Sequence, residues 1–185
     1  MSEDPWYAER RARWKPNTVR LLLIAESAPD DGGDIAHRRF FYDDTLTGRD
    51  GLFRQVVHVL FGNPELKSGP GAKVPWLEKL RDQGVYLIDL AAVPVNYHSK
   101  SERAAALQQN IDATIALAKE LDPEGVVLVK QNVFDLLTGP LRTAGLRVLH
   151  DEFIPFPASG QQARFRERFA AATRALAPVS AETGG

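Results

Sequence analysis

The chain has 185 residues, of which 44% are hydrophobic and 25% are charged, and its formal net charge is −1. These values are typical of a single globular domain, and they exclude a collagenous repeat, a coiled coil and a chain that is disordered throughout. Cysteine is absent, which excludes disulfides, thiolate nucleophiles, zinc knuckles and iron–sulfur clusters. No apolar run approaches the roughly 20 residues that span a bilayer, and residues 1–15 carry no secretory apolar segment. We therefore expect a soluble cytoplasmic protein with no membrane partner.

Basic side chains are concentrated near the two ends of the chain. We interpret residues 1–18 as a basic N-terminal arm, residues 19–178 as a single domain and residues 179–185 as a frayed tail. The basic clusters have two explanations, an ordinary solvated surface or a face that binds nucleic acid. Their members are Arg10, Arg11, Arg13, Lys15 and Arg20 at the start, and Arg164, Arg166, Arg168 and Arg174 at the end.

Four short apolar runs rich in Val, Ile and Leu are predicted to be strands. None of them alternates polar with apolar residues, which is typical of strands that are covered on both faces. In chain order they are Val19–Ala25, Gly84–Leu90, Val126–Lys130 and Leu146–His150.

Segments with helical periodicity lie between and after these runs. Ser99 with Glu102, and Ser159 with Gln162, have the spacing of capping boxes, which predicts a helix start at both places. The predicted helices cover residues 52–61, 76–80, 107–121, 133–137 and 165–176.

Strands and helices therefore alternate along the chain, and their connections are long enough for crossovers between parallel strands. The predicted fold is α/β, a three-layer α/β/α sandwich with a central, mostly parallel four-stranded sheet. Gly139-Pro140 is expected to end the helix before the fourth strand, and residues 67–73 (KSGPGAK) are expected to form a surface loop.

Polar side chains at the carboxyl ends of the predicted strands are the first candidates for a site, because open α/β sheets bind ligands there. Glu26 and Ser27 follow the first strand, and Asp89 ends the second and precedes a loop with Asn96. The third strand runs into Lys130-Gln131-Asn132. A carboxylate at the end of a buried strand costs desolvation unless it is paired or wet. Helix capping or pairing with an Arg is therefore the structural alternative for both carboxylates.

The fourth strand leads through Phe156 to Ser159-Gly160, at a predicted helix start. A capped helix N-terminus binds anions, and Gly lets a phosphate approach the backbone. Arg164 and Arg168 follow on one face of that helix. These residues predict a grip on a DNA phosphate, with a plain capped surface helix as the alternative.

Three consecutive aromatic residues, Phe40, Phe41 and Tyr42, lie in the long segment between Gly32 and Gly51. They belong to no periodic pattern. Such a cluster either packs into the core beneath a long loop or offers a stacking platform for a flat ring, which is how a base is held.

Motifs for other chemistries are absent or incomplete. The chain has no Gly-x-Gly-x-x-Gly after a strand and no Walker-type Gly-Lys-Ser/Thr. Ser27 follows a strand, as a nucleophile would, but its neighbours lack the Gly-x-Ser-x-Gly elbow. The four His residues show no metal-ligand spacing, so no metal site is predicted.

The order of these pieces resembles the uracil-DNA glycosylase superfamily over residues 19–176. Ala25-Glu26-Ser27-Ala28-Pro29 stands where members have a motif of the Gly-Glu-Ala-Pro-Gly kind, and Phe41 matches the aromatic residue that stacks on the extruded base. Asp89 ends a strand where the family has a base-reading Asn. Phe156-Pro157-Ala158-Ser159 occupies the place of a His-Pro-Ser-Pro motif. Because Cys is absent, the resemblance is to divergent members without an iron–sulfur cluster.

The resemblance implies a monofunctional DNA glycosylase that hydrolyses the N-glycosidic bond of a flipped, damaged or deaminated base. The expected partner is single- or double-stranded DNA, the expected state is a monomer, and no cofactor is expected. Glu26 would stabilise an oxocarbenium-like transition state, Phe41 would stack on the base and Asp89 would read its edge. The other residues expected around the substrate are Ser27, Tyr42, Asn96 and Phe156.

Two alternatives stay open at this point. Phe156 in place of the motif His suggests a non-catalytic nucleic-acid-binding protein of the same fold. Ser27 with His98 or His150 suggests a small-molecule serine hydrolase of a different class.

Overall fold

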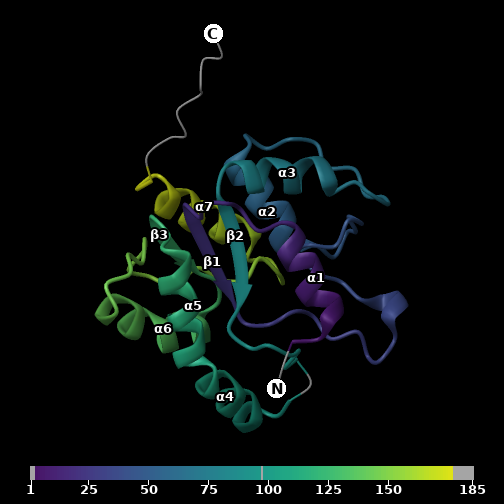
Figure 1. Cartoon of the computed structure of the whole chain (residues 1–185). Helices are drawn as coiled ribbons and strands as arrows, with labels where there is room; N and C mark the ends of the chain where they lie inside the picture. Colours follow the sequence, from purple (N-terminus) through teal and green to yellow (C-terminus); the bar gives the residue numbers. More distant parts are fainter. Residues whose placement is uncertain (1–2, 97, 177–185) are drawn as a thin grey trace.

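The computed structural model describes residues 3–96 and 98–176, so residues 179–185, interpreted above as a frayed tail, lie outside the described part (Figure 1). The strands are β1 (Leu21–Ala25), β2 (Val85–Asp89) and β3 (Gly125–Leu128). The helices are α1 (Pro5–Arg13), the short 3-10 helix η1 (Ile35–His37), α2 (Gly51–Leu60), α3 (Val74–Asp82), α4 (Lys100–Gln109), α5 (Ile111–Leu121), α6 (Gln131–Thr143) and α7 (Gln162–Thr173).

The three strands form one parallel sheet in the order β2-β1-β3, which confirms the predicted parallel sheet of an α/β fold. β1 lies in the centre, and all of its residues are buried. Ala25 of β1 pairs with Asp89 of β2, and Ile24 pairs with Leu128 of β3. The chain therefore leaves all three strands at the same edge of the sheet, where Glu26 follows β1.

The prediction of a fourth strand over Leu146–His150 is wrong. This segment makes one parallel bridge, between Val148 and Val126 of β3. The backbone ladder does not continue, because the amide of Leu128 donates to Nε2 of the His150 imidazole, 2.9 Å away, instead of to a backbone carbonyl. The sheet of the described residues therefore has three strands, and beyond β3 it is extended only by two isolated parallel bridges, Val126–Val148 and Val129–Ile154.

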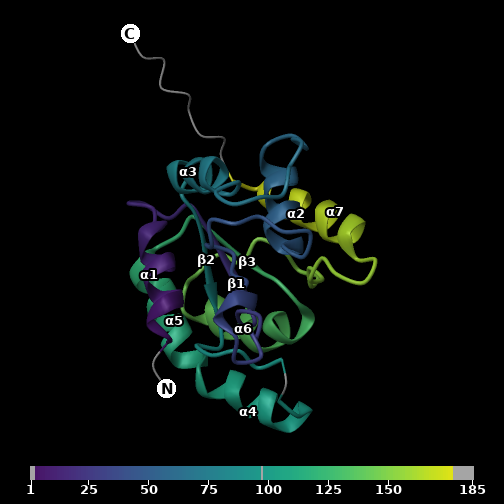
Figure 2. The same ribbon diagram turned by 90° about the vertical axis from the view of Figure 1, so that its right-hand side faces the viewer.

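Helices lie on both sides of the sheet. Figure 2 shows α2 and α7 on one side of the strands and α1 and α5 on the other. The apolar faces of α2 and α7 bury the rings of Phe53, Phe165 and Phe169. Burial of a Phe side chain contributes about 1.5–3 kcal/mol, so these two helices anchor one side of the core.

Residues 1–18, interpreted as a basic arm, contain helix α1. Asp4 starts this helix, because its side chain accepts a hydrogen bond from an amide of the first turn. Tyr7 and Trp14 are buried, so the helix packs against the core. Arg11 extends from it to Asp89 at the end of β2.

Two predicted helices have different boundaries in the structure. The single helix expected over residues 107–121 is two helices, α4 and α5, divided at Asn110, whose side-chain amide donates to the carbonyl of Ala106. The helix expected to stop at Gly139-Pro140 continues to the end of α6. Leu141 is fully buried, and this packing outweighs the hydrogen bond that Pro140 cannot donate.

Of the two capping boxes predicted to start helices, the structure contains one. The capping box of Ser99 and Glu102 is confirmed, with both of its reciprocal hydrogen bonds at the start of α4. The second predicted box is wrong, because α7 begins at Gln162 without a side-chain cap, and Ser159 has a φ of 50° in the turn before it. The surface loop predicted over residues 67–73 is also wrong at its end, where Lys73 is fully buried.

Candidate active site

A cavity of about 430 Å³ opens at the carboxyl ends of the strands. This volume lies within the range of about 300–1,000 Å³ that is typical of ligand pockets. Six of the residues predicted from the sequence line the cavity, and they come from five separate segments of the chain. These residues are Glu26, Ser27, Phe41, Asp89, Asn96 and Phe156.

Glu26 follows β1 and is 7% exposed. Its carboxylate is paired with the Lys130 ammonium, accepts a hydrogen bond from the Asn132 amide at 3.0 Å, and lies 3.5 Å from the Arg103 guanidinium. Lys130 has a φ of 88°, a conformation that L-residues rarely adopt, at the turn between β3 and α6. Glu26 is therefore held by one amide and two cationic side chains at the floor of the cavity.

Asp89 ends β2, and its side chain is 6% exposed. The guanidinium of Arg11 donates to its carboxylate at 3.0 Å and to the carbonyl of Leu87 at 3.1 Å. Burial raises the pKa of Asp89 above its ordinary value, and the charge of Arg11 opposes this shift. The pairing with an Arg that was the structural alternative for Asp89 is therefore present, although the residue also lines the cavity.

The aromatic segment divides between the core and the cavity. Phe41 is half-buried, lines the cavity and makes an edge-on contact with Phe53 at a centroid distance of 5.2 Å. Tyr42 is 2% exposed, and its hydroxyl donates to the carbonyl of Leu87 and accepts from the amide of the same residue. Burial raises the pKa of the Tyr42 hydroxyl. Tyr42 is thus a core residue that does not line the cavity, whereas Phe40 and Phe41 both line it.

Phe156 lies on the rim of the cavity and is 42% exposed. The loop that carries Phe156 packs against the start of α2, where Gly51 contacts the carbonyl of Pro157. A Cβ at Gly51 would be 3.0 Å from that oxygen. A larger residue at this position would push the carbonyl of Pro157 away by a few tenths of an ångström, so Gly51 permits the close packing of the Phe156 loop on α2.

The residues predicted to grip a phosphate do not lie at the cavity. Ser159 and Gly160 are exposed and do not line it. Arg164 and Arg168 both stack on Phe153, at 5.2 and 5.1 Å from its ring centroid, and Arg168 also pairs with Glu152. The predicted phosphate site therefore lacks its capped helix start, and its two arginines are engaged on the outer face of α7.

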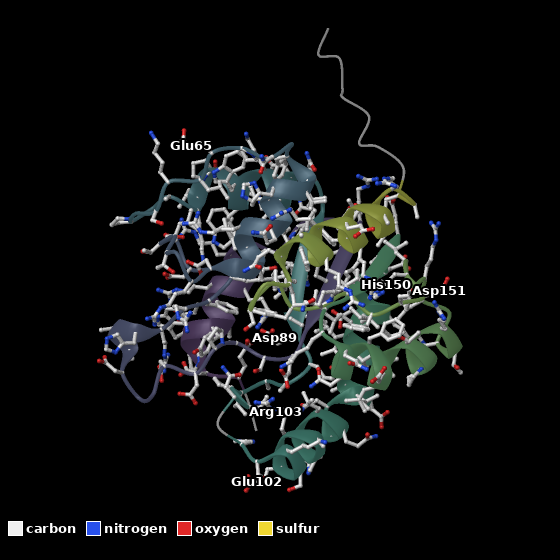
Figure 3. All side chains as sticks on the ribbon, turned by 180° about the vertical axis from the view of Figure 1, so that it is seen from behind. Glu65, Asp89, Glu102, Arg103, His150 and Asp151 are labelled. Carbon is white, nitrogen blue, oxygen red and sulfur yellow. The ribbon has the colours of Figure 1, made fainter. Side chains whose placement is uncertain are left out.

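The geometry of a serine hydrolase is not present among the described residues. The Ser27 hydroxyl accepts a hydrogen bond from the Val95 amide at 3.4 Å. Both ring nitrogens of His150 are bonded to backbone groups, and burial lowers the pKa of its imidazole. Figure 3 shows His150 beside Asp151, well away from Asp89, which lies near the centre with Arg103 below it. No hydrogen bond joins Ser27 to His150 or to the exposed His98 within the described part of the chain.

Several residues around the cavity were missed or given no role from the sequence. Lys130 ends a predicted strand and Asn132 follows it, so the sequence predicts their position at the site but not their pairing with Glu26. Arg103 follows the capping box of α4 and also donates to the carbonyl of Asn96. For Lys73, no local sequence pattern predicts a buried side chain beside the site.

Lys73 lies buried behind the cavity wall. Its ammonium donates to the carboxylate of Asp50 at 2.9 Å and to the carbonyl of Phe40 at 2.8 Å. Burial lowers the pKa of Lys73, and the charge of Asp50 opposes this shift. Asp50 lines the cavity, so this pair connects the aromatic segment to the start of α2.

Comparisons with known proteins add no relative: no family model, curated protein or solved structure matches this chain. Within residues 3–96 and 98–176, no three acidic or histidine side chains are grouped so that they could hold a metal ion. No helix of that part is both long enough and apolar enough to cross a membrane.

Proposed function

We propose that this protein is a DNA-base glycosylase similar to the uracil-DNA glycosylase superfamily, and that its cavity receives a base flipped out of DNA. One observation carries the proposal. The cavity at the carboxyl ends of the strands gathers Glu26, Asp89 and the aromatic rings of Phe41 and Phe156. A flat ring with polar edges fits a site that combines aromatic walls with carboxylates.

Each of these side chains has a role that follows from its surroundings. Phe41 offers its ring for stacking, because the contacts with its neighbours are edge-on. Asp89, held by Arg11, presents carboxylate oxygens that accept from an exocyclic amino group of a base. Substrate recognition would thus depend on a donor at the edge of the base.

The chemical step would be hydrolysis of the bond between the base and C1′ of the sugar. As this bond breaks, its electron pair leaves with the base, positive charge develops on the sugar, and water attacks C1′. Glu26 would stabilise that charge and accept the proton of the water, while Lys130 and Asn132 hold its carboxylate in place. Phe156 offers no hydrogen bond to the departing base, so the reaction would favour damaged or deaminated bases that leave readily.

The test is single-turnover base release from a panel of oligonucleotides, each carrying one modified base. We expect release from at least one substrate, detected as strand cleavage after alkaline treatment of the abasic product. Binding without release from any substrate would favour the non-catalytic alternative, to which the pairing of Glu26 with Lys130 and the presence of Phe156 also point. Neither binding nor release would refute both.

A further inference from the structure

The charges around the cavity do not balance. The charged residues of the cavity wall are the carboxylates Glu26, Asp50 and Asp89 and the cations Arg39, Arg49, Arg103 and Lys130. Every carboxylate has a cationic partner of its own. Glu26 faces two of the lining cations, whereas Asp89 and Asp50 are paired with cations that lie behind the wall.

Asp50 is the carboxylate that could most readily have neutralised Arg49, its neighbour in the chain. One of its oxygens accepts from the buried Lys73 ammonium at 2.9 Å. The other accepts from the amide and the hydroxyl of Thr47, at 2.6 and 2.9 Å. Asp50 is therefore fully engaged within the protein and leaves Arg49 free of an ion pair.

The guanidinium groups of Arg39 and Arg49 make no hydrogen bond, ion pair or ring contact with the described residues. Arg103 and Lys130, by contrast, both form ion pairs with Glu26. Both arginines also line a second hollow, of about 790 Å³, next to the cavity. Two acidic side chains of that hollow have other cationic partners, since Asp31 pairs with Arg38 and Asp43 with Arg10. A third, Asp30, accepts from the amide of Gly32 and makes no ion pair with Arg39 or Arg49. Arg39 and Arg49 thus line both hollows, and neither guanidinium is paired with a carboxylate of the described residues.

We infer that Arg39 and Arg49 bind a phosphodiester of the DNA strand next to the nucleotide that enters the cavity; this inference rests on the proposed function. Guanidinium groups match phosphate oxygens in bidentate geometry, and free groups need not break an internal ion pair to bind. The pair takes over the role predicted for Arg164 and Arg168, which are engaged elsewhere. A neutral substrate would gain no ion pair from these two free guanidinium groups.

The first experiment measures DNA binding as a function of salt, using a fluorescein-labelled single strand with the best base of the panel. Each phosphate contact that is lost reduces the slope of log K against log salt by about 0.7 for a single strand. We expect Arg39→Ala and Arg49→Ala each to lower the slope by about that amount, and the double variant to lower it by about twice as much. Arg174→Ala is the matched control, because Arg174 is exposed, lies outside both hollows, and its guanidinium makes no hydrogen bond or ion pair with the described residues.

The second experiment changes the ligand. The same strand is prepared with neutral methylphosphonates in place of the phosphodiesters on either side of the modified base. Wild-type protein should lose affinity for this strand, whereas the double variant should bind both strands equally. Competition with inorganic phosphate separates the two sources of the anion, and displacement of the strand only at phosphate concentrations far above that of the strand is expected for a diester site.

The outcomes separate this inference from the proposed function. Unchanged salt slopes in the arginine variants, or equal sensitivity of wild type and double variant to the methylphosphonates, would overturn the phosphate site even if base release is observed. Reduced slopes without base release from any substrate would support the phosphate site and refute the glycosylase. Tight binding of inorganic phosphate by a protein that does not bind the strand would overturn the assignment to DNA.

Discussion

Replacement of Glu26 by Gln separates a catalytic role from a structural one. The substitution keeps the size of the side chain and leaves an amide oxygen that can accept from Asn132, but it removes the charge. Lys130 and Arg103 would lose their carboxylate, and their side chains are 37% and 31% exposed, so water compensates part of the loss. We expect a cost of about 1–2 kcal/mol, between the values for exposed and buried pairs.

The two roles predict different magnitudes in different measurements. A stability loss of this size lowers the Tm of a domain of this length by about 2–8 °C, whichever role Glu26 has. If its charge also stabilises the transition state, base release should slow by a further factor of about 10²–10³, as for other electrostatic contributions of about 3–4 kcal/mol. Single-turnover release, at protein concentrations that saturate the strand, would show this loss while the affinity for DNA stays within a few-fold of wild type.

The matched control is Glu124→Gln, which removes a carboxylate from the ion pair with Arg20, outside the cavity. It should change neither base release nor DNA affinity. A Glu26→Gln variant that melts earlier but releases the base within a few-fold of the wild-type rate would refute the catalytic role. Asp89 would then be the next carboxylate of the cavity to examine, because Asp50 is fully engaged with Lys73 and Thr47.

Three further predictions concern the walls of the cavity. Because burial raises the pKa of Asp89, the contribution of this residue to the unfolding free energy falls as the pH rises from its unfolded pKa to its higher folded pKa. The difference in unfolding free energy between wild type and Asp89→Asn should show this decline in urea titrations at several pH values. The same variant should shift the ranking of bases towards uracil. Lys73→Met leaves Asp50 buried without its cation and should lower the unfolding free energy by about 3–5 kcal/mol in the same titrations, whereas a loss below 1 kcal/mol would contradict the buried pair. Phe41→Ala should weaken binding of the flipped base by about 1–3 kcal/mol, measured by fluorescence anisotropy. Phe61→Ala removes another half-buried ring, outside the cavity, and should leave the binding unchanged. Equal effects of the two substitutions would exclude stacking by Phe41.

The sequence predicts where the site lies better than it predicts which side chains pair with one another there. Continuous apolar runs are typical of strands covered on both faces, and parallel strands end at one edge of a sheet, so Glu26 and Asp89 could be placed together. Their partners could not be predicted, because Lys130 contacts Glu26 across 104 positions of the chain and Arg11 contacts Asp89 across 78. No local pattern encodes such contacts.

The errors in the fold also have a physical origin. The segment Leu146–His150 has the composition of a strand, but the imidazole of His150 takes the amide that the ladder would have used. Lys73 ends a Gly-rich segment of surface-loop composition, yet it is buried because Asp50 and the carbonyl of Phe40 satisfy its ammonium. In both places the hydrogen bonds of one side chain outweigh the average behaviour of the surrounding residues.

Helix α1 has a consequence for where this domain begins. Hydropathy alone sets its first residue at Val19, the start of the first apolar run. A protein shortened to that residue would lose Arg11, whose guanidinium supplies the only cation paired with Asp89 among the described residues. It would also uncover the core beneath Tyr7 and Trp14. The minimal folding unit therefore starts upstream of the sheet, and binding or activity should be compared between chains that keep residues 3–18.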